Sequence, residues 1–118
     1  MTQRELRQAD YLSHMLEALS LAQSYVEGIS KTDFLHDKKT QQAVILNIMV
    51  IGEAATKLAD EYPAFVAKFP QVQWKSMRGM RNRLAHGYFD INLDVVWETV
   101  RQALPEPEGQ LRQIQQAL

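Results

Sequence analysis

Hydrophobic residues recur along this chain at steps of three and four, which is the spacing of one face of an α-helix, and strand-like alternation is essentially absent. The first series follows Thr2-x-x-Glu5, a sequence that can form a capping box, and it stops at Gly28. We therefore expect a long first helix whose apolar positions are Leu6, Ala9, Leu12, Leu16, Leu19, Ala22 and Val26.

A second, broader apolar pattern predicts a helix from about Lys38 to about Glu61. Its apolar residues cover more than one face, which is typical of a central helix that packs against two neighbours. These residues are Val44, Ile45, Ile48, Met49, Ile51, Ala55 and Leu58. Residues 30–37 are expected to connect the two helices with room for one helical turn. Pro63 and Pro70 break the segment that follows, and one short helix is expected between them at 64–69.

Two further helices are expected in the second half of the chain. The first of them ends near Gly87, a residue that suits the left-handed conformation often found after a helix end. The residues of this helix that we expect to point toward the core are Trp74, Met77, Met80, Leu84 and Ala85. Asp90 or Asn92 caps the next helix, which the run PEPEG at 105–109 interrupts before a last amphipathic piece. The whole pattern predicts one domain over residues 1–118, an all-α, up-down bundle of four to five helices.

Composition narrows the class of protein. An apolar content of 46% with 23% charged residues is typical of a soluble globular domain. The absence of cysteine excludes disulfides and thiolate chemistry. We expect no stretch long and apolar enough to cross a membrane, no leader segment at the N-terminus and no membrane partner, hence a cytoplasmic protein.

The net charge of −1 hides an uneven distribution. Between Tyr62 and Phe89 there are five cations and no acid, whereas the other 90 residues carry eight Lys or Arg against 14 Asp or Glu. The five cations are Lys68, Lys75, Arg78, Arg81 and Arg83. A basic segment on an acidic body suits local engagement of phosphate, and a solvated basic helix face is the alternative reading.

The candidate chemistry lies inside this basic segment, in the spacing R-x4-H-x-Y. Arg81 offers a permanently charged, planar set of donors for phosphate oxygens, and His86 exchanges a proton near neutral pH. In RNA the 2′-hydroxyl is an internal nucleophile, so cleavage needs only a base, an acid and a charge stabiliser. The spacing therefore predicts RNA cleavage without a metal or other cofactor, with Arg81 and His86 as catalytic residues.

Two segments, WKSMRGMRNRLAHGYFDINLDVVW at 74–97 and IGEAATKLADEYP at 51–63, resemble the HepT-like branch of the HEPN superfamily. That family consists of small helical RNase toxins encoded beside a minimal nucleotidyltransferase antitoxin. The resemblance implies an endoribonuclease toxin of a type VII-like module with a cognate nucleotidyltransferase as partner. It also implies that Tyr88 is the residue to which the antitoxin attaches AMP. Gly87 departs from the family, in which Glu is frequent between the His and the Tyr.

A single chain is short of catalytic groups, because one histidine makes one proton transfer at a time. Residues five apart on a helix point about 140° away from each other, so we expect the helix to unwind at Gly87 and return His86 toward Arg78 and Arg81. A two-fold homodimer would place two copies of each catalytic residue around one cleft, as HEPN proteins generally do. Asn82 is expected to position the RNA substrate or the histidine, with Arg78 auxiliary.

Several residues keep a second interpretation. Tyr88 and Phe89 could pack as an aromatic pair under the helix end. Glu53, inside an apolar segment, either orients an arginine of the third long helix or sits at a solvent edge. His14 and His36 are expected to be ordinary polar positions. The alternative function is a non-catalytic dimeric HEPN module that binds a protein partner or a nucleotide, or a plain helical interaction protein with a basic face.

Overall fold

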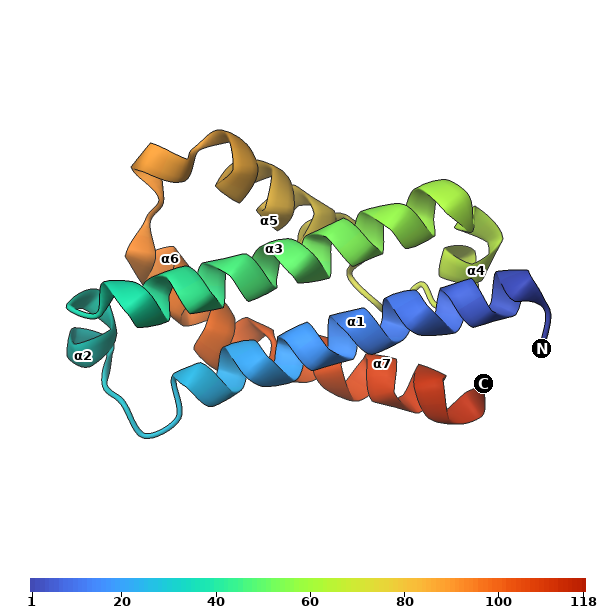
Figure 1. The fold of residues 1–118 in the computed structure, drawn as a ribbon, viewed down its shortest axis with the longest axis horizontal. Coiled ribbons are helices and arrows are strands. Elements are labelled where there is room, and N and C mark those ends of the chain that lie inside the picture. Colours follow the sequence, from blue (N-terminus) through green and yellow to red (C-terminus); the bar gives the residue numbers. More distant parts are fainter.

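The centre of the structure is an antiparallel pair of long helices, α1 (Gln3–Tyr25) and α3 (Lys38–Glu61), which lie side by side over most of their length (Figure 1). This computed structural model describes all residues from 1 to 118. Helix α5 (Trp74–His86) packs on α3, and α7 (Pro105–Ala117) packs on α1. The two outer helices therefore flank the central pair.

Shorter elements join these four helices. Single turns α2 (Lys31–Leu35) and α4 (Pro63–Ala67) precede and follow α3. A 3₁₀ turn η1 (Tyr88–Asp90) links α5 to α6 (Leu93–Glu98), and α6 continues as a π-helical segment η2 (Thr99–Ala103). The chain contains no strand. The predicted all-α bundle is confirmed.

Side-chain caps explain where several helices begin. The Thr2 hydroxyl accepts a hydrogen bond from the backbone of Glu5 at 3.1 Å, at the start of α1. Asp37 caps α3 through the Thr40 amide at 3.2 Å. Asn92, one of the two expected caps, accepts from two backbone amides at the start of α6. Capping satisfies donors that the first turn of a helix leaves free.

One cluster of 25 buried hydrophobic residues forms the core, and every apolar position expected on α3 is buried or packed against it. The prediction of a core position was wrong for two residues, Leu6 and Ala85. Leu6 is 43% exposed, because residues 3–7, the start of α1, lie outside the buried core. Ala85 is exposed because α5 packs mainly on one long helix, so a narrower stripe of it is covered. The expected break at PEPEG is present: η2 ends at Ala103, and Pro105 is the first residue of a new helix, α7, where a missing N–H is tolerated.

Helix α3 also corrects the expectation that no stretch could span a membrane. It has 24 residues, and its most apolar window reaches a mean hydropathy of 1.3, so length and composition alone would allow a span. Of that window, 56% is buried inside the bundle, between α1 and α5. Burial against two neighbours gives the helix a reason to be apolar without a bilayer.

Candidate active site

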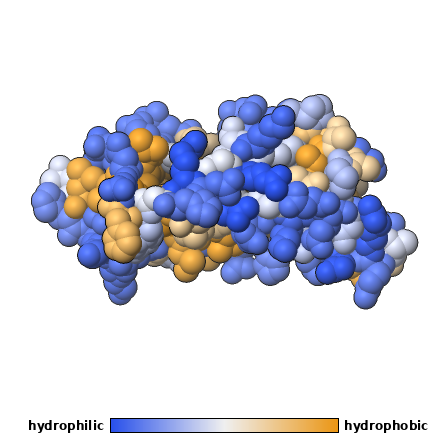
Figure 2. Space-filling model, turned by 90° about the horizontal axis from the view of Figure 1, so that it is seen from above, coloured by the Kyte–Doolittle hydropathy of each residue, from blue (hydrophilic) through white to orange (hydrophobic).

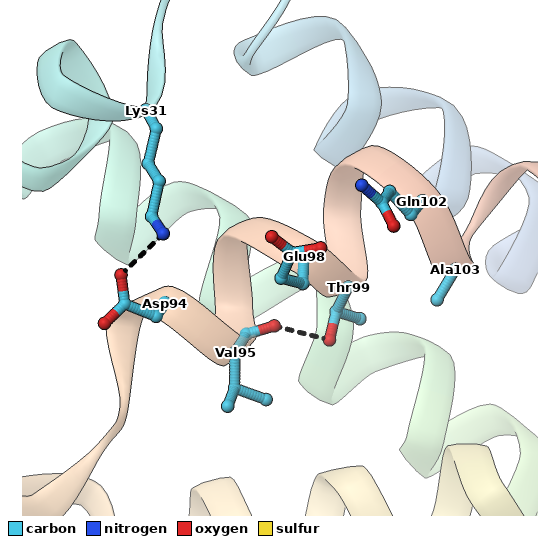
Figure 3. A pocket seen from close by; sticks show the side chains of 7 residues that line it. All are labelled: Lys31, Asp94, Val95, Glu98, Thr99, Gln102 and Ala103. Atoms are coloured by element: carbon cyan, nitrogen blue, oxygen red, sulfur yellow. Dashed lines mark hydrogen bonds and ion pairs between the residues drawn. The ribbon is translucent and has the colours of Figure 1, made fainter.

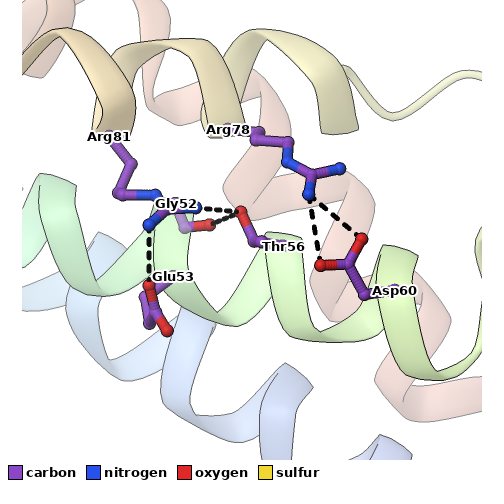
Figure 4. A network of polar contacts seen from close by, with 6 residues as sticks. All are labelled: Gly52, Glu53, Thr56, Asp60, Arg78 and Arg81. Carbon is purple, nitrogen blue, oxygen red and sulfur yellow. Dashed lines mark hydrogen bonds and ion pairs between the residues drawn. The ribbon is translucent and has the colours of Figure 1, made fainter.

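Arg81 is held against α3 by two side chains (Figure 4). One terminal nitrogen, Nη2, donates to the Thr56 hydroxyl at 3.2 Å, and Nη1 lies 3.2 Å from a carboxylate oxygen of Glu53. The Thr56 hydroxyl in turn donates to the Gly52 carbonyl at 2.8 Å. The Arg81 side chain is 26% exposed, so most of it is covered. These contacts fix the direction of its positive charge.

The close approach of α5 to α3 at this point depends on Gly52. A Cβ atom at Gly52 would overlap the side chain of Arg81 and stand 2.7 Å from the Met77 carbonyl oxygen. The tight packing leaves the Nε atom of Arg81 buried with no hydrogen-bond partner. Buried donors are rarely unpaired, so this atom is one that the site leaves unsatisfied.

Arg78 lies one turn before Arg81 and makes its own ion pair with α3. Its Nη2 donates to both carboxylate oxygens of Asp60, at 3.0 and 3.1 Å (Figure 4). Both side chains of this pair are about half exposed, so water screens their attraction. The two arginines expected to form a phosphate-binding row are thus each partly neutralised by an acid of α3.

His86 is not brought to Arg81 within one chain. It is the last residue of α5, its side chain is exposed, and it makes no hydrogen bond or ion pair. The expected unwinding was wrong, because the Gly87 amide donates to the Arg83 carbonyl at 2.9 Å and closes the final turn. Gly87 has a φ of −120° and is not left-handed. Arg81 and His86 therefore keep the angular separation of a regular helix.

Tyr88 and Phe89 project from the 3₁₀ turn that follows. Their rings meet edge to face at 5.9 Å between centroids, yet Tyr88 is 52% and Phe89 98% exposed. The alternative of an aromatic pair packed under the helix end was therefore wrong. Asn82 is also exposed, on the outer side of α5.

Seen from above, the side of the molecule that includes α5 carries a hydrophilic band across its middle, with hydrophobic patches beside the band (Figure 2). Of the five cations between Tyr62 and Phe89, only Arg78 and Arg81 take part in ion pairs. The others, Lys68, Lys75 and Arg83, carry charge that no acid of the chain offsets by direct contact. Unpaired cations remain available to attract phosphate.

The other histidines and an open hollow of the surface lie outside this site. His14 is exposed without a recorded contact, and His36 Nδ1 lies 2.8 Å from the Thr32 carbonyl oxygen. An open hollow of about 460 Å³ lies over α6 and η2, and its charged groups include Asp94 and Glu98 (Figure 3). The Asp94 carboxylate, hydrogen-bonded to Lys31, raises the pKa of that lysine. No three metal-ligating side chains gather anywhere in the chain.

Comparison with known proteins decides the family. The model of a family described as ribonuclease HepT-like matches residues 15–114. The chain belongs to the ribonuclease HepT-like family, within the HEPN superfamily. The predicted family membership is thus confirmed, and the family places the chain among the ribonucleases.

Relatives of the same family match over most of their length. A "Probable ribonuclease HepT" of Thermococcus cleftensis is 35% identical over 89% of this chain and 93% of its own length. A "Putative RNase" of Caldanaerobacter subterraneus subsp. tengcongensis is 38% identical over 90% of this chain and 92% of its own. No solved structure gives a significant match.

Sequence reasoning missed three residues of this candidate site: Gly52, Thr56 and Asp60. A usable signal was present, since Glu53, Thr56 and Asp60 follow one another at steps of three and four and so share one face of α3. A polar stripe on an apolar helix indicates a polar partner across the interface. The contribution of Gly52 has no such signal, because it depends on the distance between two helices.

Proposed function

We propose that this chain is a metal-independent endoribonuclease toxin of a type VII-like toxin–antitoxin module. His86 would transfer the proton of the attacking 2′-hydroxyl or of the departing 5′-oxygen, and Arg81 would stabilise charge on the phosphorane-like transition state. Asn82 would position the RNA. The observation that carries the proposal is the contrast at one helix end: Arg81 is oriented by Glu53 and Thr56, whereas His86 is free to meet a substrate.

The same geometry supports a composite site made by two copies of the chain. Each chain supplies one histidine at the end of α5, on a different side of the helix from its own Arg81. A two-fold axis near this helix end would bring His86 of one copy and His86 of the other to the same phosphate, as base and acid. A solution monomer with full activity would contradict this part of the proposal.

Tyr88 is proposed as the residue that a cognate nucleotidyltransferase modifies. Its phenol oxygen would attack the α-phosphate of ATP, lose its proton and release pyrophosphate, which leaves AMP on the ring. The ring is half exposed and lies two residues from His86, so a partner enzyme can reach it. An added phosphate group there would repel RNA and block the cleft.

The test is induced expression of the wild-type chain and of Arg81→Ala, His86→Ala and Tyr88→Phe in cells without an antitoxin, at equal soluble abundance. Wild type and Tyr88→Phe should arrest growth and fragment RNA, and the other two should do neither. Co-expression of Arg81→Ala with His86→Ala should not restore activity if the two copies share one site, because the mixed dimer carries one His86 and the site needs two as base and acid. Four identical outcomes would remove the catalytic assignment.

One observation favours a second function, a non-catalytic HEPN module that binds a protein or a nucleotide. Arg78 and Arg81 already pair with acids of α3, as arginines that only hold helices together would. This function predicts that the wild type and the Arg81→Ala and His86→Ala variants leave RNA equally intact.

A further inference from the structure

A cavity of about 270 Å³ lies beside the candidate active site, between the end of α5, η1 and the start of α6. We call it the Asp90 cavity. Its apolar wall includes Met80, Leu84, Ile91 and Val96, and its polar groups are Arg83, Asp90 and Asn92. An apolar wall with a few placed polar groups is the usual anatomy of a small-ligand site. Its size, below the ~300–1,000 Å³ of sites for drug-sized ligands, suits one base better than a whole cofactor.

The position of the cavity connects it to RNA. Gly87, which joins His86 to Tyr88, forms part of its lining, and so does Arg83 from the basic segment. A strand whose scissile phosphate lies at the exposed His86 therefore has a neighbouring base within reach of the opening. Single-stranded RNA is commonly recognised through bases that leave the stack and enter such pockets.

The carboxylate is the informative group, because an acid beside a phosphate-binding site repels the RNA backbone. Asp90 makes no side-chain hydrogen bond and no ion pair in this structure. Two carboxylate oxygens can accept two neighbouring donors, and the Watson–Crick edge of guanine presents two, N1–H and the 2-amino group. Adenine, cytosine and uracil each place an acceptor beside their donor, so they leave one carboxylate oxygen facing an acceptor.

The remaining polar groups donate, which fits the rest of a guanine. The Arg83 guanidinium makes one weak recorded contact, 3.8 Å from the Met80 sulfur, so its other donors are free. Arginine with guanine O6 and N7 is the commonest specific pairing between a side chain and a base in DNA complexes. The Asn92 oxygen is occupied by the Asp94 and Val95 amides, which leaves its nitrogen as a donor.

We propose that the Asp90 cavity binds a guanine base next to the cleaved phosphate, with Asp90 accepting from N1–H and the 2-amino group and Arg83 donating to O6. This inference rests on the proposed ribonuclease function and assigns it a base preference. The chain then cuts single-stranded RNA next to guanine.

The test uses short single-stranded RNAs with one guanine, and the same RNAs with inosine, adenine or cytosine in its place. Inosine lacks only the 2-amino group. Wild type should cut the guanine RNA about tenfold or more faster than the inosine and adenine RNAs, the size expected for loss of a paired hydrogen-bond contact. Asp90→Asn should cut all of them but lose the difference between guanine and inosine. Asp94→Asn is the matched control, since Asp94 lies outside the cavity lining and makes the same charge change.

Binding of the same RNAs to the His86→Ala protein, followed by fluorescence anisotropy, separates this inference from the proposed function. If wild type cuts nothing while His86→Ala binds guanine RNA with an Asp90-dependent preference, the cavity assignment stands and the nuclease proposal falls. Cleavage without base preference, a preference for cytosine, or a guanine preference unchanged in Asp90→Asn would overturn the assignment. A protein that neither cuts nor binds RNA would overturn both.

Discussion

Gly52 of α3 lies directly under Arg81 of α5, at a point where the two helices come so close that a Cβ atom has no room. The same glycine also helps to position Arg81. Its backbone carbonyl accepts a hydrogen bond from the Thr56 hydroxyl, and that hydroxyl in turn accepts one from Arg81. A change in the separation of these helices therefore changes the direction of the positive charge of Arg81.

We predict that Gly52→Ala destabilises the fold by about 1–3 kcal/mol, the usual range for overpacking a well-filled interface. It should also lower RNA cleavage, because Arg81 and the Met77 carbonyl must move to admit the methyl group. Urea denaturation gives the stability and a cleavage assay gives the rate. Gly109→Ala is the matched control: nothing lies within 4 Å of its added Cβ, and alanine favours a helix more than glycine does. Equal behaviour of the two variants would contradict the close approach.

Glu53→Gln and Thr56→Val each remove one contact of Arg81 while keeping the shape of the side chain. Glu53→Gln should change stability little, by about 0.2–1 kcal/mol, because Glu53 is 52% exposed and water screens the ion pair. Thr56→Val should cost more, about 1–3 kcal/mol, because Thr56 is buried and loss of its hydroxyl leaves a nitrogen of Arg81 without a partner. Cleavage should fall several-fold in kcat with KM nearly unchanged, since a misdirected Arg81 chiefly affects the transition state. Glu108→Gln, which breaks an ion pair with Arg112 on α7, is the control and should leave cleavage unchanged. A loss of stability without a loss of rate would make these contacts purely structural.

The sequence predicted the bundle well because its helices carry their own local signals. The bounds of α3 follow from the apolar run between Asp37 and the turn before Pro63. The first helix ends at Tyr25, three residues before the expected stop, and Gly28 lies in the turn that follows with a φ of 74°. Expectations failed where an outcome depended on neighbours. Ala85 has the spacing of a core residue, yet no helix covers it. Gly87 has the composition of a left-handed cap, yet its amide completes an ordinary last turn.

The candidate site was predictable in its residue types and not in its contacts. Arg81 and His86 could be named from spacing and Tyr88 from the family resemblance, and their catalytic and regulatory roles stay predictions. The partner of Glu53 could be guessed only as some arginine, because the choice between Arg78 and Arg81 depends on how α5 is placed along α3. That placement depends on one glycine, which no periodicity reveals.

The cap of α3 should make stability depend on acid pH. Hydrogen bonds from the side chain and then the backbone of Thr40 hold the pKa of Asp37 below its usual value. A group whose pKa is lower in the folded state stabilises the fold above its unfolded pKa of ~3.9, and that contribution is lost as pH falls through the folded value. Asp37→Ala should therefore lower the Tm at pH 7, and the difference from wild type should shrink below about pH 4. Asp10→Ala, at an exposed position without recorded contacts, should show neither effect.

Tyr88→Phe should separate regulation from cleavage. The ring keeps its edge-to-face contact with Phe89, so the turn is preserved, while the phenol oxygen that would receive AMP is gone. We expect full RNA cleavage by the variant, no gain of an AMP mass when it is incubated with the cognate nucleotidyltransferase and ATP, and no relief of toxicity by that enzyme. Wild type should gain the mass and lose activity, and Tyr25→Phe, at another exposed tyrosine, should behave as wild type does. If intact-protein mass spectrometry still finds AMP on Tyr88→Phe, the acceptor lies elsewhere. If the variant fails to cut RNA at all, the phenol belongs to the catalytic machinery.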